Sequence, residues 1–266
     1  NKYWPTIHGT PECFLALNRE TLLNKRYVCI TGVNSANAIK WMTSISEYME
    51  NSDSEKKHGI FILLVEKASV SNAKHIVQFK YADYVSDYDC MMLCLTLISD
   101  LSCSRAEKMY LCEVANNIAN NQVELAGLLV SEKLELIYHP LVATERVFQE
   151  NGIKITNLPE RVNRAVWEAQ IKLVFPKLEN FRAEIIRKYE KKLQSYLPIR
   201  SSNDDEIKRA ADLEIGQLFH ICKENSASRI IDFAEYELLK KMRDARNKLA
   251  HWNLLSYKQL KDIGIM

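Results

Sequence analysis

The scarcity of chain-breaking residues is what most limits the folds open to this sequence. Its 266 residues contain only seven glycines and six prolines, and almost no strand-like segments occur after residue 104. Glycine and proline mark the turns of β-rich folds, so their scarcity favours long helices over a turn-rich sandwich. We therefore expect a mostly helical protein.

The first hundred residues differ from the rest because they mix strand-like and helix-like runs. Apolar, β-prone segments occupy residues 27–32, 59–66 and 75–79, and helical periodicity occupies residues 35–49 and 87–98. The middle segment, GIFILLVE, is continuously apolar, which is typical of a strand covered on both faces. We predict an α/β region over residues 1–103.

From residue 104 onward the pattern predicts helices, with one exception. Residues 105–120 and 122–132 have helical periodicity, whereas residues 134–138 fit a short strand, such as the wing of a small winged-helix-like domain. A glycine, a proline and an asparagine mark residues 152–159 as the expected boundary. We predict a helical spacer over residues 104–158.

The last hundred residues predict an all-α helical bundle over residues 159–266. Five helices are expected, at 161–175, 177–196, 206–223, 228–252 and 256–263. Pro176 stands between the first two. It either separates them or kinks one long helix, because proline removes an amide donor and crowds the preceding turn.

Composition favours a soluble, cytoplasmic protein. Hydrophobic residues make up 47% and charged residues 26%. No run of about 18 apolar residues occurs and the start lacks a signal-peptide pattern, so we expect no membrane association. The seven cysteines are odd in number and lie mostly in apolar stretches, which favours buried free thiols over disulfides or a metal site.

Charge is unevenly distributed along the chain. Residues 161–266 contain 21 Lys and Arg against 15 Asp and Glu, whereas the whole chain has a net charge of only +2. A basic C-terminal part suits a polyanionic partner such as RNA, although an excess of this size is also found on ordinary solvated surfaces.

The segment MRDARNKLAHW, residues 242–252, carries the candidate site. On an ideal helix one arc is apolar and is expected to face the core, formed by Ile231, Ala234, Leu238, Met242, Ala245 and Leu249. Arg246, Asn247 and His251 fall outside this arc, with the small Ala250 between them. Further candidates for contact with RNA lie on the same helix: Tyr236, Lys240, Arg243 and Lys248.

These residue types suit cleavage of an RNA phosphodiester. The ribose 2′-hydroxyl must lose a proton and the leaving 5′-oxygen must gain one, and an imidazole such as that of His251 can do either near neutral pH. A guanidinium at Arg246 can stabilise the charge that accumulates on the phosphoryl oxygens. Asn247 would orient the phosphate or hold Arg246. This chemistry requires no metal and no cofactor.

The motif Arg246-Asn247-Lys248-Leu249-Ala250-His251 resembles that of the HEPN superfamily. In that family an arginine is followed four to six residues later by a histidine, with a polar residue directly after the arginine. The resemblance covers about 100 residues, from residue 161 to the end. It implies a helical bundle that forms homodimers, and RNA cleavage that leaves a 2′,3′-cyclic phosphate and a 5′-hydroxyl. It also implies a role in toxin or antiphage-defence systems.

Several alternatives remain open from the residues alone. If the pattern is a coincidence, Arg246 is expected to pair with Asp244 or Asp232, and His251 is expected to cap the helix C-terminus. The bundle is otherwise a non-catalytic module that dimerises or holds a regulatory partner protein, or the protein is a nucleic-acid-binding regulator using residues 104–150. Two carboxylates, Glu184 and Glu214, are candidates to reach the His251 region. Among the other histidines, His220 is the second candidate.

The first region resembles the later half of a P-loop ATPase. GIFILLVEK resembles a Walker B-type strand ending in Glu66, and HIVQFKYADYVSDYD the final strand and start of the lid in signal-transduction ATPases. The phosphate-binding pattern G-x-x-x-x-G-K-[ST] is absent, and the turn Gly32-Val33-Asn34-Ser35 lacks its lysine. The pattern was lost, lies upstream of Asn1, or the likeness is coincidental. From this resemblance we expect the first region to act as a sensor that binds a nucleotide.

Overall fold

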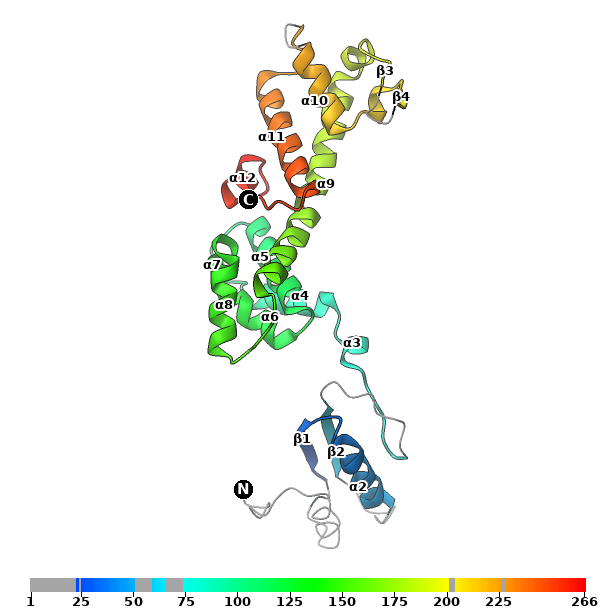
Figure 1. Cartoon of the computed structure of the whole chain (residues 1–266), viewed down its shortest axis with the longest axis vertical. Helices are drawn as coiled ribbons and strands as arrows, with labels where there is room; N and C mark the ends of the chain where they lie inside the picture. The colour runs from blue at the N-terminus through cyan, green and yellow to red at the C-terminus, as the bar shows by residue number, and fades with distance from the viewer. Residues whose placement is uncertain (1–22, 24, 51–58, 66–73, 201–203, 226–227) are drawn as a thin grey trace. The chain divides into compact units, whose positions relative to one another are not determined.

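The computed structural model describes residues 23, 25–50, 59–65, 74–200, 204–225 and 228–266. The chain divides into two compact units, residues 1–81 (unit 1) and 82–266 (unit 2), each of which is described by itself (Figure 1). Helices account for most of the described residues, which confirms the expectation of a mostly helical protein.

Unit 1 contains a parallel two-stranded sheet crossed by one helix. Strand β1 (Tyr27–Val33) leads into α2 (Ala38–Glu50) and then β2 (Ile60–Val65), and the two strands pair in parallel with Tyr27 opposite Ile60. Parallel neighbours require a crossover connection of this kind. The two strands and the helix expected here are confirmed.

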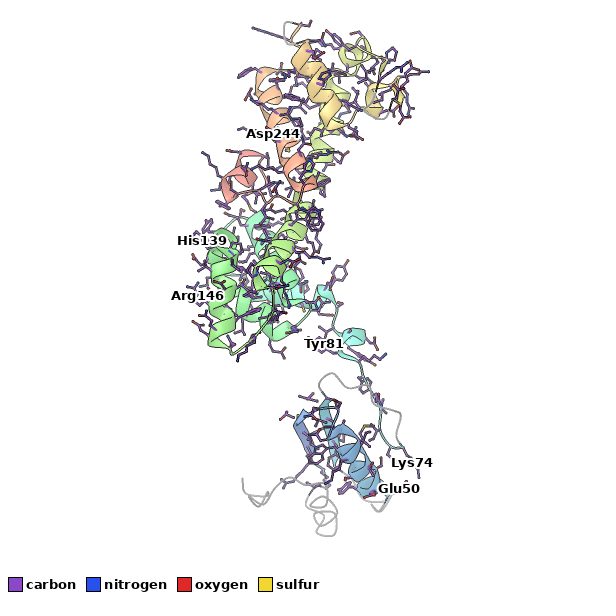
Figure 2. All side chains as sticks on the ribbon, in the orientation of Figure 1. Glu50, Lys74, Tyr81, His139, Arg146 and Asp244 are labelled. Atoms are coloured by element: carbon purple, nitrogen blue, oxygen red, sulfur yellow. The ribbon has the colours of Figure 1, made fainter. Side chains whose placement is uncertain are left out.

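The third expected strand, at residues 75–79, is wrong. Residues 76–80 are neither helix nor strand. The preceding chain is held against α2 instead: the Ser46 hydroxyl donates to the Lys74 carbonyl at 2.8 Å, and the Lys74 ammonium lies 2.9 Å from the Glu50 carboxylate (Figure 2). These contacts bind the segment to the helix rather than to a sheet edge.

The core of unit 1 lies between α2 and one face of the sheet. Tyr48 is fully buried, and its ring meets Phe61 edge-on with centroids 5.1 Å apart. Alternate residues of both strands point away from α2 and stay exposed, so the expected cover on both faces is wrong for the described residues. The exposed apolar side chains of that second face are Tyr27, Ile60, Ile62 and Leu64.

Unit 2 is built mainly from helices, preceded by the short α3 (Tyr81–Tyr84) at the division. Its elements are α4 (Asp87–Leu97), α5 (Arg105–Ala119), α6 (Val123–Val130), α7 (Leu134–Tyr138), α8 (Pro140–Glu150), α9 (Leu158–Gln194), β3 (Ile199–Arg200), β4 (Glu206–Ile207), a 3-10 turn (Ala210–Asp212), α10 (Ile215–Glu224), α11 (Phe233–Ala250) and α12 (Tyr257–Asp262).

Helix α9 runs along the whole of unit 2. Helices α5 and α8 pack beside its first half, and α10 and α11 lie beside its second half (Figure 1). The two helices expected at 161–175 and 177–196 are therefore one, with the exposed Pro176 inside it. Backbone angles leave the helical range at Tyr189 (φ −117°, ψ 17°) and not at Pro176, so the irregular point lies about three and a half turns later than the proline.

Two further expectations for local structure are corrected. Residues 134–138 form helix α7 rather than a strand or wing, because Leu136 and Ile137 are buried next to one another in the sequence, as on a helix face. Residues 206–223 do not form one helix. The chain first pairs β4 with β3, and α10 begins only at Ile215, where Glu214 and Gln217 form a capping box.

A single hydrophobic core extends through unit 2, from Cys94 on α4 to Ile265 near the C-terminus. It includes both the expected spacer and the expected bundle, and Ile153, Ile155 and Leu158 pack against it from the loop that had been expected to separate them. The compact units divide at 81/82, and the domain boundaries expected at 103/104 and 158/159 stay predictions. Four cysteines are buried as free thiols, as expected: Cys90, Cys94, Cys112 and Cys222.

Candidate functional site

Helix α11 is amphipathic, and its buried face differs slightly from the expected one. Met242, Ala245 and Leu249 are buried as predicted. Leu239 completes this face, whereas Leu238 is half-buried and Ala234 is exposed. Ile231 is buried as expected, but it precedes the helix, which begins at Phe233, so the buried face of the helix itself starts at Leu239.

Arg246 lies beside this buried face with 42% of its side chain exposed. Its Nη1 donates to Oδ1 of Asn247 at 3.3 Å, and its Nη2 lies 3.8 Å from the exposed carboxylate of Glu214. Asp244 pairs with Arg243 instead, and Asp232 is not the partner either. Ion pairs at exposed positions contribute little, so the guanidinium of Arg246 is free to exchange Glu214 for an anionic ligand.

His251 is the C-cap of α11 and not a residue of the helix, which was expected to continue to residue 252. Its N–H is shared between the carbonyls of Asn247 (3.2 Å) and Lys248 (3.1 Å). The imidazole is exposed and, among the described residues, forms no hydrogen bond or ion pair. On an ideal helix Arg246 and His251 would diverge by about 140°, with Ala250 between them. The structure brings Arg246 and Asn247 into contact, but not Arg246 and His251.

The chain after His251 turns sharply through Trp252. Trp252 has a left-handed backbone (φ 60°), its N–H donates to the Leu249 carbonyl at 3.2 Å, and the Asn253 N–H donates to the Lys248 carbonyl at 2.9 Å. This pair of hydrogen bonds is a Schellman motif, which satisfies the last carbonyls of the helix. The Trp252 ring stacks on Trp167 of α9, with centroids 4.0 Å apart and an interplanar angle of 15°.

Two side chains of α9 fix the end of α11 and the segment after it. The Trp167 indole N–H donates to the Leu249 carbonyl at 2.8 Å. The buried Gln170 donates to the Leu255 carbonyl (2.9 Å) and accepts from the Leu255 N–H (2.8 Å), in the manner of a neighbouring β-strand. Its amide also donates to the Tyr110 hydroxyl at 3.0 Å. The backbone is therefore anchored both before His251, at Leu249, and after it, at Leu255.

The candidates for contact with RNA fall into two groups. The Arg243 guanidinium lies 3.8 Å from the ring centroid of Phe219 on α10, and Tyr236 stacks on the same ring at 5.7 Å. Arg243 also pairs with Asp244, which is labelled on α11 in Figure 2. Arg243 and Tyr236 are thus both engaged in packing against Phe219. Lys240 and Lys248 are exposed, and the Lys248 ammonium donates to Gln259 at 3.2 Å.

The N-terminal end of α11 is held by a charged cluster around Tyr189. The Tyr189 hydroxyl donates to Glu235 at 2.5 Å and accepts from the Asp232 N–H at 3.3 Å. The Lys188 ammonium lies 2.9 Å from Glu235 and 3.2 Å from Asp232. Hydrogen bonds to Tyr189 and Lys188 hold the pKa of Asp232 below its usual range, and its carboxylate partners raise the pKa of Lys188.

A second polar cluster ties α12 to α5 and α7. The Tyr257 hydroxyl hydrogen-bonds to the Glu107 carboxylate, and the Tyr257 ring meets Tyr138 edge-on at 4.8 Å. This hydrogen bond is the main reason why the pKa of Glu107 is lowered. The cluster fixes α12 directly after the candidate site. The second histidine candidate, His220, lies exposed on α10, 3.5 Å from Glu224.

In unit 1, the turn that stands where a phosphate-binding loop would lie is closed by its own side chains. The Asn34 Oδ1 accepts from the Ala36 N–H at 3.0 Å, and the Asn37 Oδ1 accepts from the Asn34 N–H at 2.8 Å. A phosphate-binding loop offers such amides to its ligand. Glu66, the expected end of the Walker B-type strand, lies outside the described residues.

Comparison with known proteins adds no relatives: no family model, curated protein or solved structure matches the chain. Within the part of the chain that the structure describes, none of the helices combines the length and apolar character needed to cross a bilayer. In the same residues, no three His, Cys, Asp or Glu side chains are grouped so as to hold a metal ion. The case for a function therefore depends on the end of α11.

Proposed function

We propose that this protein is an endoribonuclease of HEPN type that cleaves RNA without a metal, using Arg246 and His251. The observation that supports it best is the exposure of a guanidinium and an imidazole at one helix end, with a small alanine between them. The anchoring of this end by Trp167 and Gln170 is also in favour, because transition-state stabilisation requires groups that are already in position.

In the proposed reaction the ribose 2′-oxygen attacks the neighbouring phosphorus, and the bond from phosphorus to the 5′-oxygen breaks. His251 takes the proton of the 2′-hydroxyl or supplies one to the leaving oxygen. Arg246 binds the non-bridging oxygens, where charge accumulates, and Asn247 steadies the guanidinium through their 3.3 Å contact. The products are a 2′,3′-cyclic phosphate and a 5′-hydroxyl.

The proposed active form is a homodimer. One copy presents Arg246 and His251 along a wide arc, and one imidazole cannot take a proton and give one at the same moment. A second copy related by a two-fold axis would present the same surface and supply the other imidazole. Measurement of the mass in solution tests this point, and a strict monomer that cleaves RNA would overturn the dimer without overturning the chemistry.

The decisive experiment is incubation of the full chain with single-stranded RNA in EDTA, followed by analysis of the product ends. Cleavage to a 2′,3′-cyclic phosphate is expected, and a 2′-deoxy strand should resist it. His251→Ala and Arg246→Ala should each lose cleavage, whereas His220→Ala, which changes an exposed histidine on α10, should retain it. Equal activity of His251→Ala and the native protein would refute the proposal.

A second candidate function is a non-catalytic interaction module that binds RNA or a partner protein. The observation in its favour is that Arg246 and His251 make no contact with one another while Lys240 and Lys248 are exposed. The same incubation separates the two functions, because a binding module retains RNA without cutting it. The role in toxin or antiphage defence is proposed from the resemblance alone. It predicts growth arrest on expression, relieved by His251→Ala.

A further inference from the structure

Trp252, directly after His251, is a residue to which the proposed chemistry assigns no role. It occupies the left-handed position of a Schellman motif, where glycine is the usual residue because it has no Cβ to clash with the backbone. A tryptophan at this position is strained. Strain of this kind persists where the surrounding structure or a function requires that side chain.

Burial does not account for the side chain. Trp252 is 63% exposed, so folding removes little of its apolar surface from water. One face of the indole is covered by Trp167, at 4.0 Å and nearly parallel. Trp167 is itself fixed by its hydrogen bond to the Leu249 carbonyl, so the pair is held in one orientation. The result is a rigid aromatic ring with an open outer face.

Cationic residues precede this ring in the sequence, on the last turns of the same helix. Arg246 and Lys248 precede it on α11 with exposed head groups, and His251 adjoins it in the chain. An open aromatic face beside groups that attract phosphate is the arrangement by which proteins bind unpaired nucleotides, because every base has a face that can stack.

We propose that the outer face of Trp252 stacks on an unpaired base of the RNA whose phosphate lies at Arg246 and His251. This inference rests on the proposed function and extends it to a substrate class, single-stranded RNA. Bases inside an A-form duplex stack on one another and offer no free face, so duplex RNA cannot use the ring. The base so held would adjoin the phosphodiester that is cleaved.

Binding of a short 2′-O-methyl oligonucleotide tests the stacking without cleavage, because the 2′-hydroxyl is blocked. The single strand should quench tryptophan fluorescence, and the same strand annealed into a duplex should bind more weakly. Trp252→Ala should weaken binding of the single strand by roughly 10-fold, and Trp252→Phe should retain most of the affinity. Trp41→Phe, on α2 in unit 1, is the matched control for the loss of one tryptophan.

Trp252→Gly separates the loss of stacking from a loss of folding. Glycine suits the left-handed backbone, so this variant should be at least as stable as Trp252→Ala yet bind the oligonucleotide equally weakly. Native affinity in Trp252→Gly, or equal affinity for duplex and single strand, would overturn the stacking. Such a result would leave the ring to contact a protein.

The two proposals fail in distinguishable ways. Binding that depends on Trp252, in a protein that does not cut unmodified RNA, would support the stacking and overturn the nuclease. Native kcat/KM for single-stranded RNA in Trp252→Gly, with cleavage still lost in His251→Ala, would overturn the stacking and support the nuclease.

Discussion

Helix α11 carries similar side chains in different surroundings along its length. Between its first turn and its middle, Tyr236 and Arg243 lie against the ring of Phe219, so a cation and an aromatic are engaged in packing. Near its last turn, the polar partners of Arg246 among the described residues are Asn247 and the distant carboxylate of Glu214. Arg243 and Arg246 lie within one turn of each other. The difference teaches that the neighbouring helix, and not residue type, decides which arginine is free to bind a ligand.

The sharpest way to break this comparison is the same substitution at both arginines. Arg246→Lys should lower RNA cleavage roughly 100-fold, because lysine keeps the charge but loses the planar fork that binds two phosphoryl oxygens. Arg243→Lys should leave the cleavage rate nearly unchanged and lower the melting temperature instead. Initial rates in EDTA and thermal unfolding of both variants provide the measurement. Equal loss of activity in the two would show that the helix surface acts as a uniform basic patch.

Removal of the Phe219 ring should have the next largest effect. Phe219 is buried, so Phe219→Ala should destabilise the protein by about 3 kcal/mol through lost burial and the cavity left behind. Denaturant unfolding measures the change, with His251→Ala as the control that should unfold like the native protein. A loss under about 1 kcal/mol would mean that Arg243 and Tyr236 are not held by this ring.

A smaller effect is expected at the start of α11. Tyr189→Phe removes the hydroxyl that binds Glu235 and the Asp232 N–H, and should cost about 1–2 kcal/mol, because a hydrogen bond to a carboxylate is lost. Unfolding at neutral pH provides the measurement. Cleavage by the folded variant should match that of the native protein, since this cluster lies at the far end of α11.

The smallest effect is a change in the pH dependence of stability. The lowered pKa of Asp232 means that its contribution is complete above the ordinary carboxyl value of about 3.9 and is lost as the pH falls through the folded value. Asp232→Asn removes the charge but keeps a residue favoured at a helix N-cap. The native protein should therefore be the more stable at pH 6, and the difference should shrink below about pH 4. A constant difference across this range would exclude the ion pair as its cause.

Helical periodicity was enough to predict much of α11 and its exposed residues. It placed Met242, Ala245 and Leu249 in the core and left Arg246 and Asn247 outside, because a helix face depends on local spacing alone. Glu214 was also a candidate to reach the His251 region, and the structure brings it near Arg246.

The remaining features of the site depend on contacts distant in the sequence. The engagement of Arg243 and Tyr236 requires the ring of Phe219 on another helix, which no spacing within α11 reveals. The end of α11 was expected two residues too late, because tryptophan is an unusual residue for a left-handed turn and its stack on Trp167 is a contact with another helix. The position of Trp252 directly after His251 was the one sequence feature that could have pointed to this residue.

Residues 75–79 and 206–214 show the same limit for the fold. Their composition suits a strand and a helix, but side-chain contacts such as Ser46 with Lys74 hold the chain in other conformations. Contacts of this kind arise only after the helices have packed, so a local pattern cannot contain them.

Gln170 has a consequence for how this protein can be altered. Its amide holds Leu255 through the backbone alone, and the Schellman motif holds the chain at Lys248 in the same way. The exposed side chains of Trp252 and Asn253 are therefore not what keeps the backbone of this segment in register, whereas Leu254 packs against the core. The outward-facing residues of this segment can be exchanged without rebuilding the bundle. They are therefore the natural positions for a library of substitutions that redirects nucleotide preference.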